Sequence, residues 1–140
     1  MTTSLINAAK SGIDVRLITP GVPDKKFVQF LSRSYYEPLI KAGVKVFEYT
    51  PGFIHAKMFV ADDDTAIVGT INLDYRSLDL HYECATMMYN CPAINVIKED
   101  FLLTQSKSTQ VLLETLSENK GFRLLRFLAL GILRTFSPLM

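Results

Sequence analysis

The chain contains 140 residues, of which 49% are hydrophobic and 21% are charged, and its formal net charge at pH 7 is +1. This length predicts one domain, and the hydrophobic content excludes wholesale disorder. The near-neutral charge lacks the basic footprint of a dedicated nucleic-acid-binding protein, and no apolar run reaches the roughly 20 residues that a membrane-spanning helix needs.

The first half of the sequence alternates between helical and strand patterns. Residues 2–11 predict a short helix, and residues 14–19 predict a strand that ends at a Pro-Gly turn. Apolar residues then recur every four positions over 27–39, which predicts a helix that Pro38 kinks or splits. A second strand is predicted at residues 44–49. Strand, helix and strand of these lengths indicate a βαβ unit with parallel strands.

The second half predicts a series of short strands followed by helices. We expect strands at residues 53–61, 65–69 and 80–89. The acidic triplet Asp62–Asp64 predicts a hairpin turn between the first two strands. The other predicted elements are a helical turn at 72–78 opened by Asn72 or Asp74, a helix at 93–106, a polar connector at 105–110 and a helical turn at 111–116.

These elements predict an α/β fold with a mixed, mostly parallel β-sheet flanked by helices. A βαβ sheet usually begins with a strand, whereas this sequence begins with a helix. We therefore expect the sequence to be part of a longer protein.

A last helix is predicted at residues 121–136, and nearly all of its surface is apolar. Its arginines fall within an arc of about 80° on a helical wheel, and they are Arg123, Arg126 and Arg134. Two interpretations stay open: a helix buried against the domain, or an interfacial helix on an anionic membrane. We predict a catalytic unit at 1–118 and a basic amphipathic helix at 119–140.

The residues with the most evident chemistry lie in the centre of the chain. His55 and Lys57 are two positions apart, so in a strand they would point to the same face. The lysine supplies positive charge and donors for a phosphate, and the imidazole can attack phosphorus or carry a proton. Taken alone, such a histidine is more often structural and such a lysine is usually solvated.

Further polar residues follow at short intervals. A glycine at position 69 allows the backbone to approach a ligand closely. Thr70 and Asn72 add neutral donors, and Glu83 can accept the imidazole Nδ1–H and so fix its tautomer. The set as a whole favours a phosphate-handling site.

The spacing of these residues resembles a known signature. His55-Ala56-Lys57, four residues, Asp62, six residues and then Gly69-Thr70-Ile71-Asn72 is similar to the H-x-K-x4-D-x6-G-[ST]-x-N pattern of the phospholipase D superfamily. Residues 32–39, 49–55 and 72–78 resemble bacterial cardiolipin synthases in particular. The resemblance covers almost the whole chain as the C-terminal catalytic half of such an enzyme.

The resemblance implies a phospholipase D-like half-domain and a role for each matching residue. His55 would be the catalytic histidine, and Lys57 and Asn72 would bind the phosphate with help from Thr70. Glu83 would be the carboxylate that orients the histidine.

The resemblance also implies a site without a metal or any other cofactor. Asp62, which belongs to the catalytic motif, would frame the site by bonding to backbone rather than take part in the chemistry. A metal-binding interpretation of Asp62–Asp64 ranks far lower, because consecutive carboxylates in a hairpin alternate faces.

Members of the superfamily need two such motifs facing each other, and this chain has one. His81, the other histidine, has no lysine two residues later. The implied function is a phosphatidyltransferase that makes cardiolipin from two phosphatidylglycerol molecules through a phosphohistidine. Here one half of the site is present, with His55 as nucleophile or as acid/base. The alternatives are a homodimeric phosphodiesterase or nuclease and an inactive truncated remnant.

The resemblance implies partners and a location as well. We expect phosphatidylglycerol, an anionic membrane surface and a second motif half-domain as partners, and no nucleic acid. The expected location is the bacterial cell membrane, at or associated with its cytoplasmic face.

Overall fold

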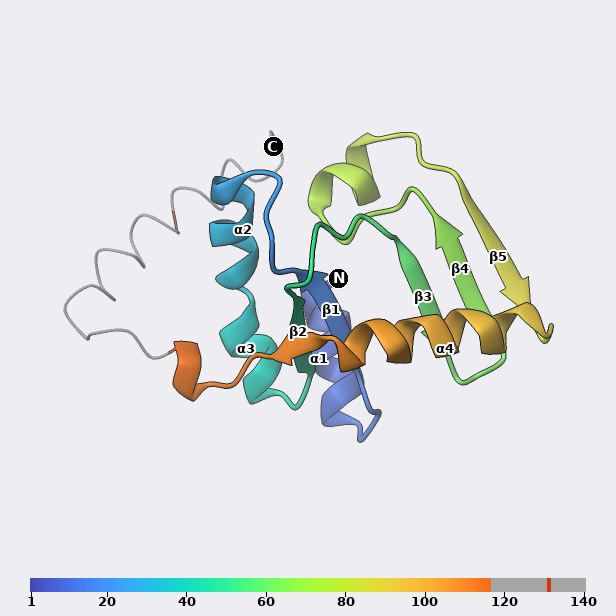
Figure 1. Ribbon diagram of the computed structural model, residues 1–140, viewed down its shortest axis with the longest axis horizontal. Helices are drawn as coiled ribbons and strands as arrows, with labels where there is room; N and C mark the ends of the chain where they lie inside the picture. The colour runs from blue at the N-terminus through green and yellow to red at the C-terminus, as the bar shows by residue number, and fades with distance from the viewer. Residues whose placement is uncertain (117–130, 132–140) are drawn as a thin grey trace.

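The protein is built from two small β-sheets with helices packed on them (Figure 1). The structure is a computed structural model that describes residues 1–116 and 131. The helices are α1 (Thr2–Lys10), α2 (Lys26–Arg33), α3 (Tyr36–Lys41) and α4 (Ala93–Ser106), with a π-helical turn at Arg76–Leu80 and a 3-10 turn at Glu114–Leu116. The strands are β1 (Arg16–Pro20), β2 (Lys45–Tyr49), β3 (Met58–Ala61), β4 (Thr65–Gly69), β5 (Ala85–Tyr89) and β6 (Ser108–Gln110).

The first sheet has the order β1-β2-β6 and contains the predicted βαβ unit. Strands β1 and β2 are parallel, with a register that runs from Arg16 opposite Lys45 to Pro20 opposite Tyr49. Helices α2 and α3 form the crossover between them. The predicted split of this helical segment is confirmed, but the break precedes Pro38. The proline is the third residue of α3, where its missing N–H is not needed.

The core lies between the first sheet and its helices. Four buried side chains form it: Tyr36, Leu39, Val44 and Val46. Apolar residues of α1 pack against this cluster, which explains why a short helix with no buried residue of its own is held in place. On its other flank, β2 pairs antiparallel with β6.

Strand β6 lies where the sequence predicted a polar connector, and that prediction was wrong at residues 108–110. The edge of β2 supplies the missing partner, with Phe47 opposite Gln110 and Tyr49 opposite Ser108. The backbone N–H of Val111 continues the pairing by donating to the carbonyl of Val46 at 2.9 Å. A three-residue polar strand of this kind is set by tertiary pairing and not by side-chain periodicity.

The second sheet has the order β3-β4-β5 and is antiparallel throughout. The predicted hairpin turn between β3 and β4 is confirmed. Asp62 and Asp63 both have positive φ angles, 52° and 62°, as the two central residues of a type I′ turn do. The N–H of Asp64 closes the turn by donating to the carbonyl of Ala61 at 3.3 Å.

The mixed α/β class is confirmed, but the expectation of a mostly parallel sheet was wrong. Among the described strands, β1–β2 is the parallel pair, and the pairs β2–β6, β3–β4 and β4–β5 are antiparallel. Helices α2 and α3 cross over between β1 and β2 and allow them to be parallel, whereas β3 and β4 are joined by a tight turn that requires an antiparallel pair.

Several predicted strands also begin later than expected. Strand β3 begins at Met58 and not at residue 53, because its partner β4 ends at Gly69 and leaves residues 53–56 without a strand to pair with. Strand β5 begins at Ala85 because the π-helical turn ends only at Leu80.

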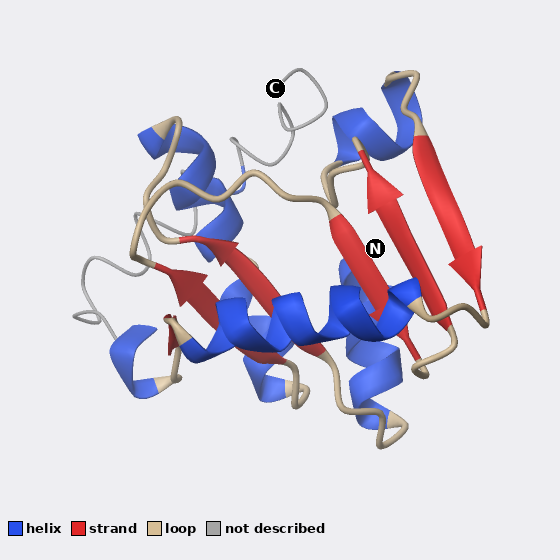
Figure 2. Ribbon diagram, turned by 45° about the vertical axis from the view of Figure 1, so that its right-hand side comes forward, coloured by secondary structure: helices blue, strands red, loops and turns tan. Residues whose placement is uncertain are grey.

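Helix α4 crosses the two sheets (Figure 2). It buries Ile94, which is 1% exposed, and Lys98 forms an ion pair with Asp63 in the hairpin turn at 2.6 Å. In the described part of the chain no helix is both long and apolar enough to cross a membrane. The predicted boundary at 118/119 and the predicted helix at 121–136 lie outside the described residues, apart from residue 131.

Candidate active site

Three segments that are distant in sequence meet at one end of the second sheet. Because the sheet is antiparallel, the residues before β3, after β4 and before β5 must lie at the same end. The N–H of Gly69 donates to the carbonyl of Lys57 at 3.2 Å, and the N–H of Thr70 donates to the carbonyl of Cys84 at 2.9 Å. The end of the sheet therefore brings together Lys57, Thr70 and Cys84, and the segments that carry His55, Asn72 and Glu83 continue from it.

Gly69 is required at this point for a reason that differs from the predicted one. A Cβ at position 69 would lie 2.5 Å from the Cα of Ala85 and would also collide with the carbonyl oxygen of Cys84. The close approach that glycine permits in this structure is to the backbone of β5, and its predicted approach to a ligand stays a prediction. The close approach to β5 allows Thr70 and Glu83 to reach each other across the strand ends.

A hydrogen-bond network holds the carboxylate of Glu83. The hydroxyl of Thr70 donates to one carboxylate oxygen, and the hydroxyl of Ser77 donates to the other at 2.6 Å. Ser77 is 5% exposed, and its hydroxyl also accepts the backbone N–H of Asn72 at 2.9 Å. The bond from Ser77, followed by the bond from Thr70, lowers the pKa of Glu83, so this residue is a carboxylate at neutral pH.

His55 and Lys57 lie before β3 and not in it, so the prediction that they share a strand face was wrong. The ring of His55 is exposed and stacks on Phe53 with 5.7 Å between ring centroids. The ammonium of Lys57 donates to the carbonyl of His55 at 2.8 Å. The lysine side chain thus folds back onto the backbone of His55.

The structure places Asp62 away from this end of the sheet. It lies in the turn at the opposite end of β3, four strand residues from Lys57, which corresponds to about 13 Å or more. A role in turn geometry fits this position, and a role at the phosphate does not. Across residues 1–116, no three His, Cys, Asp or Glu side chains converge to hold a metal ion.

Comparison with known proteins identifies the family. A family model described as the phospholipase D-like domain of cardiolipin synthase matches residues 1–103. The chain belongs to this family. It is 39% identical over 140 residues to a cardiolipin synthase of Clostridium perfringens, covering 100% of this chain and 29% of that one. It is 48% identical over 100 residues to a cardiolipin synthase of Geobacillus thermodenitrificans, covering 71% of this chain and 20% of that one.

A solved structure shows the same fold. The crystal structure of Nuc from Salmonella typhimurium, a phospholipase D family member, matches with a TM-score of 0.69 at 17% identity. The match covers 79% of this chain and 72% of that one. By contrast, the chain spans only 20% to 29% of the two cardiolipin synthases, so it corresponds to a fraction of those enzymes.

In this phospholipase D-like chain, the described contacts of Glu83 do not include His55. Its described hydrogen bonds come from Thr70 and Ser77, and the imidazole nitrogen near it is Nδ1 of His81, at 3.9 Å. The orienting bond from Glu83 to His55 stays a prediction.

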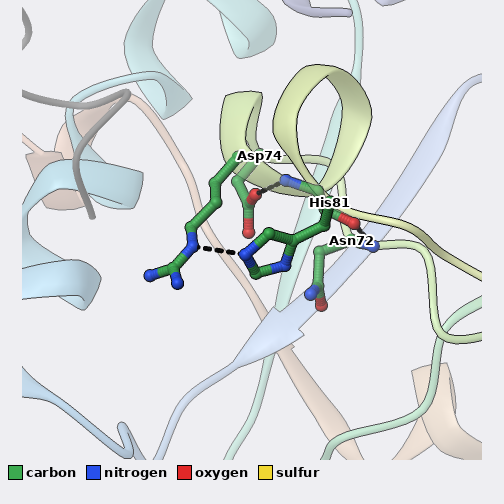
Figure 3. A pocket seen from close by; sticks show the side chains of 5 residues that line it. Asn72, Asp74 and His81 are labelled. Carbon is green, nitrogen blue, oxygen red and sulfur yellow. Dashed lines mark hydrogen bonds between the residues drawn. The ribbon is translucent and has the colours of Figure 1, made fainter.

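Sequence reasoning missed four residues that surround Asn72. The π-helical turn brings them to a cavity of about 300 Å³ beside Asn72 (Figure 3), and they are Asp74, Arg76, Ser77 and His81. One signal was present in the sequence: Asp74 lies three residues before Ser77, the spacing of a side chain that accepts a backbone N–H at the start of a helical turn. The structure shows this bond at 2.7 Å.

Proposed function

We propose that this chain supplies the second-motif half of a phosphatidyltransferase that makes cardiolipin from two phosphatidylglycerol molecules. The observation that carries the proposal is the meeting of the three motif-bearing segments, through Lys57, Thr70 and Cys84, at one end of the second sheet. Membership of the family and the identity to cardiolipin synthases support this substrate class over other phosphodiesters.

The proposed chemistry needs two histidines, one from each motif. An imidazole nitrogen attacks the phosphorus of one phosphatidylglycerol, the bond from phosphorus to the glycerol oxygen breaks, and the second histidine gives that oxygen a proton. The phosphatidyl-histidine then reacts with a hydroxyl of another phosphatidylglycerol. The second histidine takes the hydroxyl proton as the phosphorus–nitrogen bond breaks. His55 takes one of these two roles.

The remaining residues would stabilise charge on the phosphoryl oxygens. Lys57 and Asn72 hold these oxygens as negative charge develops in the transition state, and Thr70 assists. In the present structure the ammonium of Lys57 is bonded to the carbonyl of His55. A bound phosphate offers that ammonium a stronger, charge-assisted bond, so we expect the lysine side chain to turn towards it.

The second motif and the membrane complete the proposal. The facing histidine comes either from the remainder of a longer chain or from a second copy of this one. Phosphatidylglycerol lies in the bilayer, so we propose that the site works at an anionic membrane surface on the cytoplasmic side.

The test offers the purified chain phosphatidylglycerol vesicles and, separately, DNA. Cardiolipin formation that disappears in His55→Ala and persists in Lys41→Ala supports the proposal. Lys41 is a matched control because it forms an exposed ion pair with Glu37 on α3, within the helical layer of the first sheet. Cleavage of DNA that depends on His55 would replace the proposal with a phospholipase D-like nuclease. Because the isolated chain supplies one motif histidine, inactivity on both substrates would favour a remnant only if it persists after a half-domain that carries a second such motif is added.

A further inference from the structure

The cavity beside Asn72 adjoins the proposed phosphate site. It has a volume of about 300 Å³ and is lined by Asn72, Asp74, Arg76, Ser77 and His81 (Figure 3). Asn72 belongs both to this cavity and to the proposed phosphate ligands. Any group joined to the bound phosphate through an ester oxygen on the Asn72 side would therefore enter the cavity.

His81 fixes the position of the cationic side chain in this cavity. Nε of Arg76 donates to Nε2 of His81 at 2.7 Å. An arginine cannot accept a hydrogen bond, so Nε2 must be the acceptor and the ring proton must lie on Nδ1. Nδ1 faces the carboxylate of Glu83 at 3.9 Å. The imidazole thus lies between the arginine, to which it is hydrogen-bonded, and the carboxylate of Glu83, to which it is not.

Asp74 supplies acceptors on the same cavity. Its Oδ1 accepts the backbone N–H of Ser77 at 2.7 Å. A carboxylate has two acceptor oxygens, so Oδ2 can accept from a ligand while Oδ1 holds the turn. Asn72 adds an amide that both donates and accepts.

The two opposite charges of the lining suit a neutral, hydroxyl-bearing ligand that can use both of them. One carboxylate, Asp74, lies beside one guanidinium, Arg76. The carboxylate repels a second phosphate, whereas alcohol groups can donate to the carboxylate and accept from the guanidinium. The lining holds no apolar side chain, and the volume is at the lower end for ligand pockets. Both facts fit a three-carbon polyol better than an acyl chain.

We propose that this cavity binds the glycerol head group of the phosphodiester, with Arg76 and Asp74 contacting its hydroxyls and His81 positioning Arg76. The identity of the diester rests on the proposed function. The head-group contacts follow from the cavity itself.

The test uses the full chain and two soluble probes, glycerophosphoglycerol and inorganic phosphate, in titrations followed by NMR. Asp74→Asn retains a side-chain oxygen that can accept the backbone N–H of Ser77, and it replaces the second carboxylate oxygen and its negative charge by a neutral amide nitrogen. His81→Leu removes the acceptor for Arg76, and His81→Gln retains one. We expect Asp74→Asn and His81→Leu to lower the affinity for glycerophosphoglycerol about fivefold to tenfold, which is the range for one lost hydrogen bond. The affinity for phosphate should be unchanged. His81→Gln should retain most of the affinity for glycerophosphoglycerol that His81→Leu loses.

Three results would overturn the subsite: no binding of glycerophosphoglycerol to the unsubstituted chain, equal losses for both probes, or a His81→Gln variant as weak as His81→Leu. The subsite and the proposed function fail separately. Cardiolipin synthesis with unchanged head-group affinity in Asp74→Asn refutes the subsite alone. Selective head-group binding by a chain that makes no cardiolipin even when a second-motif half-domain is added supports the subsite and contradicts the function.

Discussion

Substitution of Gly69 by alanine adds one methyl group where β4 and β5 hold the site together. The new Cβ would lie 2.5 Å from the Cα of Ala85, whereas favourable carbon–carbon contacts begin at about 3.5 Å. Strand β5 must therefore retreat by about 1 Å. That shift would lengthen the bond from the Thr70 N–H to the Cys84 carbonyl, now 2.9 Å, to about 3.9 Å, which is beyond hydrogen-bond range.

The expected cost follows from these two effects. Overpacking of this kind costs about 1–3 kcal/mol, and the lost backbone bond adds about 1 kcal/mol. We expect Gly69→Ala to lower the free energy of unfolding by about 2–4 kcal/mol and to weaken phosphate binding, because Thr70 and Glu83 move apart. Urea denaturation followed by circular dichroism measures the first effect, and a phosphate titration measures the second.

Gly52→Ala is the matched control. A Cβ at position 52 would meet no atom within 4 Å, and the φ angle of Gly52 lies outside the region that disfavours side chains. This variant should be neutral or more stable by up to about 1 kcal/mol. If Gly69→Ala is as stable as Gly52→Ala and binds phosphate equally well, the account of the strand ends is wrong.

Three further predictions concern the network, the surface and the core. Ser77→Ala should raise the pKa of Glu83, because its strongest donor is lost, and an unchanged NMR titration midpoint would contradict the network. The lowered pKa of Glu83 also means that its stabilisation is present above about pH 4.5 and is lost as the pH falls through the folded-state value. The pKa of Asp14 is about 2 because of its bond from Arg16, against an ordinary value of 3.8. The stability advantage over Asp14→Asn should therefore shrink as the pH falls from 3.8 towards 2 in acid-denaturation curves. Ile94→Ala empties a fully buried position on α4 and should lower the free energy of unfolding by about 2–5 kcal/mol, measured by urea denaturation. A loss below about 1 kcal/mol would show that Ile94 does not anchor α4.

The βαβ unit could be predicted from the sequence because its signals are local. Apolar spacing over 27–39 and strand alternation at 44–49 act within a few residues of the chain. The hairpin at Asp62 and Asp63 could be predicted for the same reason.

The extent of the strands could not be predicted, because a strand continues only while a partner lies beside it. Residues 53–56 have strand-like side chains but no partner past Gly69. Residues 108–110 are polar but find a partner on the edge of β2. Neither fact is visible in the periodicity of the segment itself.

The candidate site, like the fold, could be predicted only in part. The spacing of His55, Lys57, Thr70 and Asn72 identified them as candidate residues, but their position at one end of an antiparallel sheet depends on how β3, β4 and β5 pair and could not be predicted. The cavity depends on a π-helical turn that follows Asn72. The sequence predicted a helical turn at 72–78, but not its π geometry or the cavity that it forms.

The central claim is that one phosphoryl group is held by the histidine, lysine and asparagine of the motif. The most direct measurement is a titration of the labelled chain with inorganic phosphate, observing the His55 ring, the Lys57 ammonium and the Asn72 amide. The account predicts that all three signals shift with one dissociation constant and that Lys57→Met weakens binding for all of them. Separate dissociation constants, or a His55 ring that does not respond while Asn72 does, would contradict it.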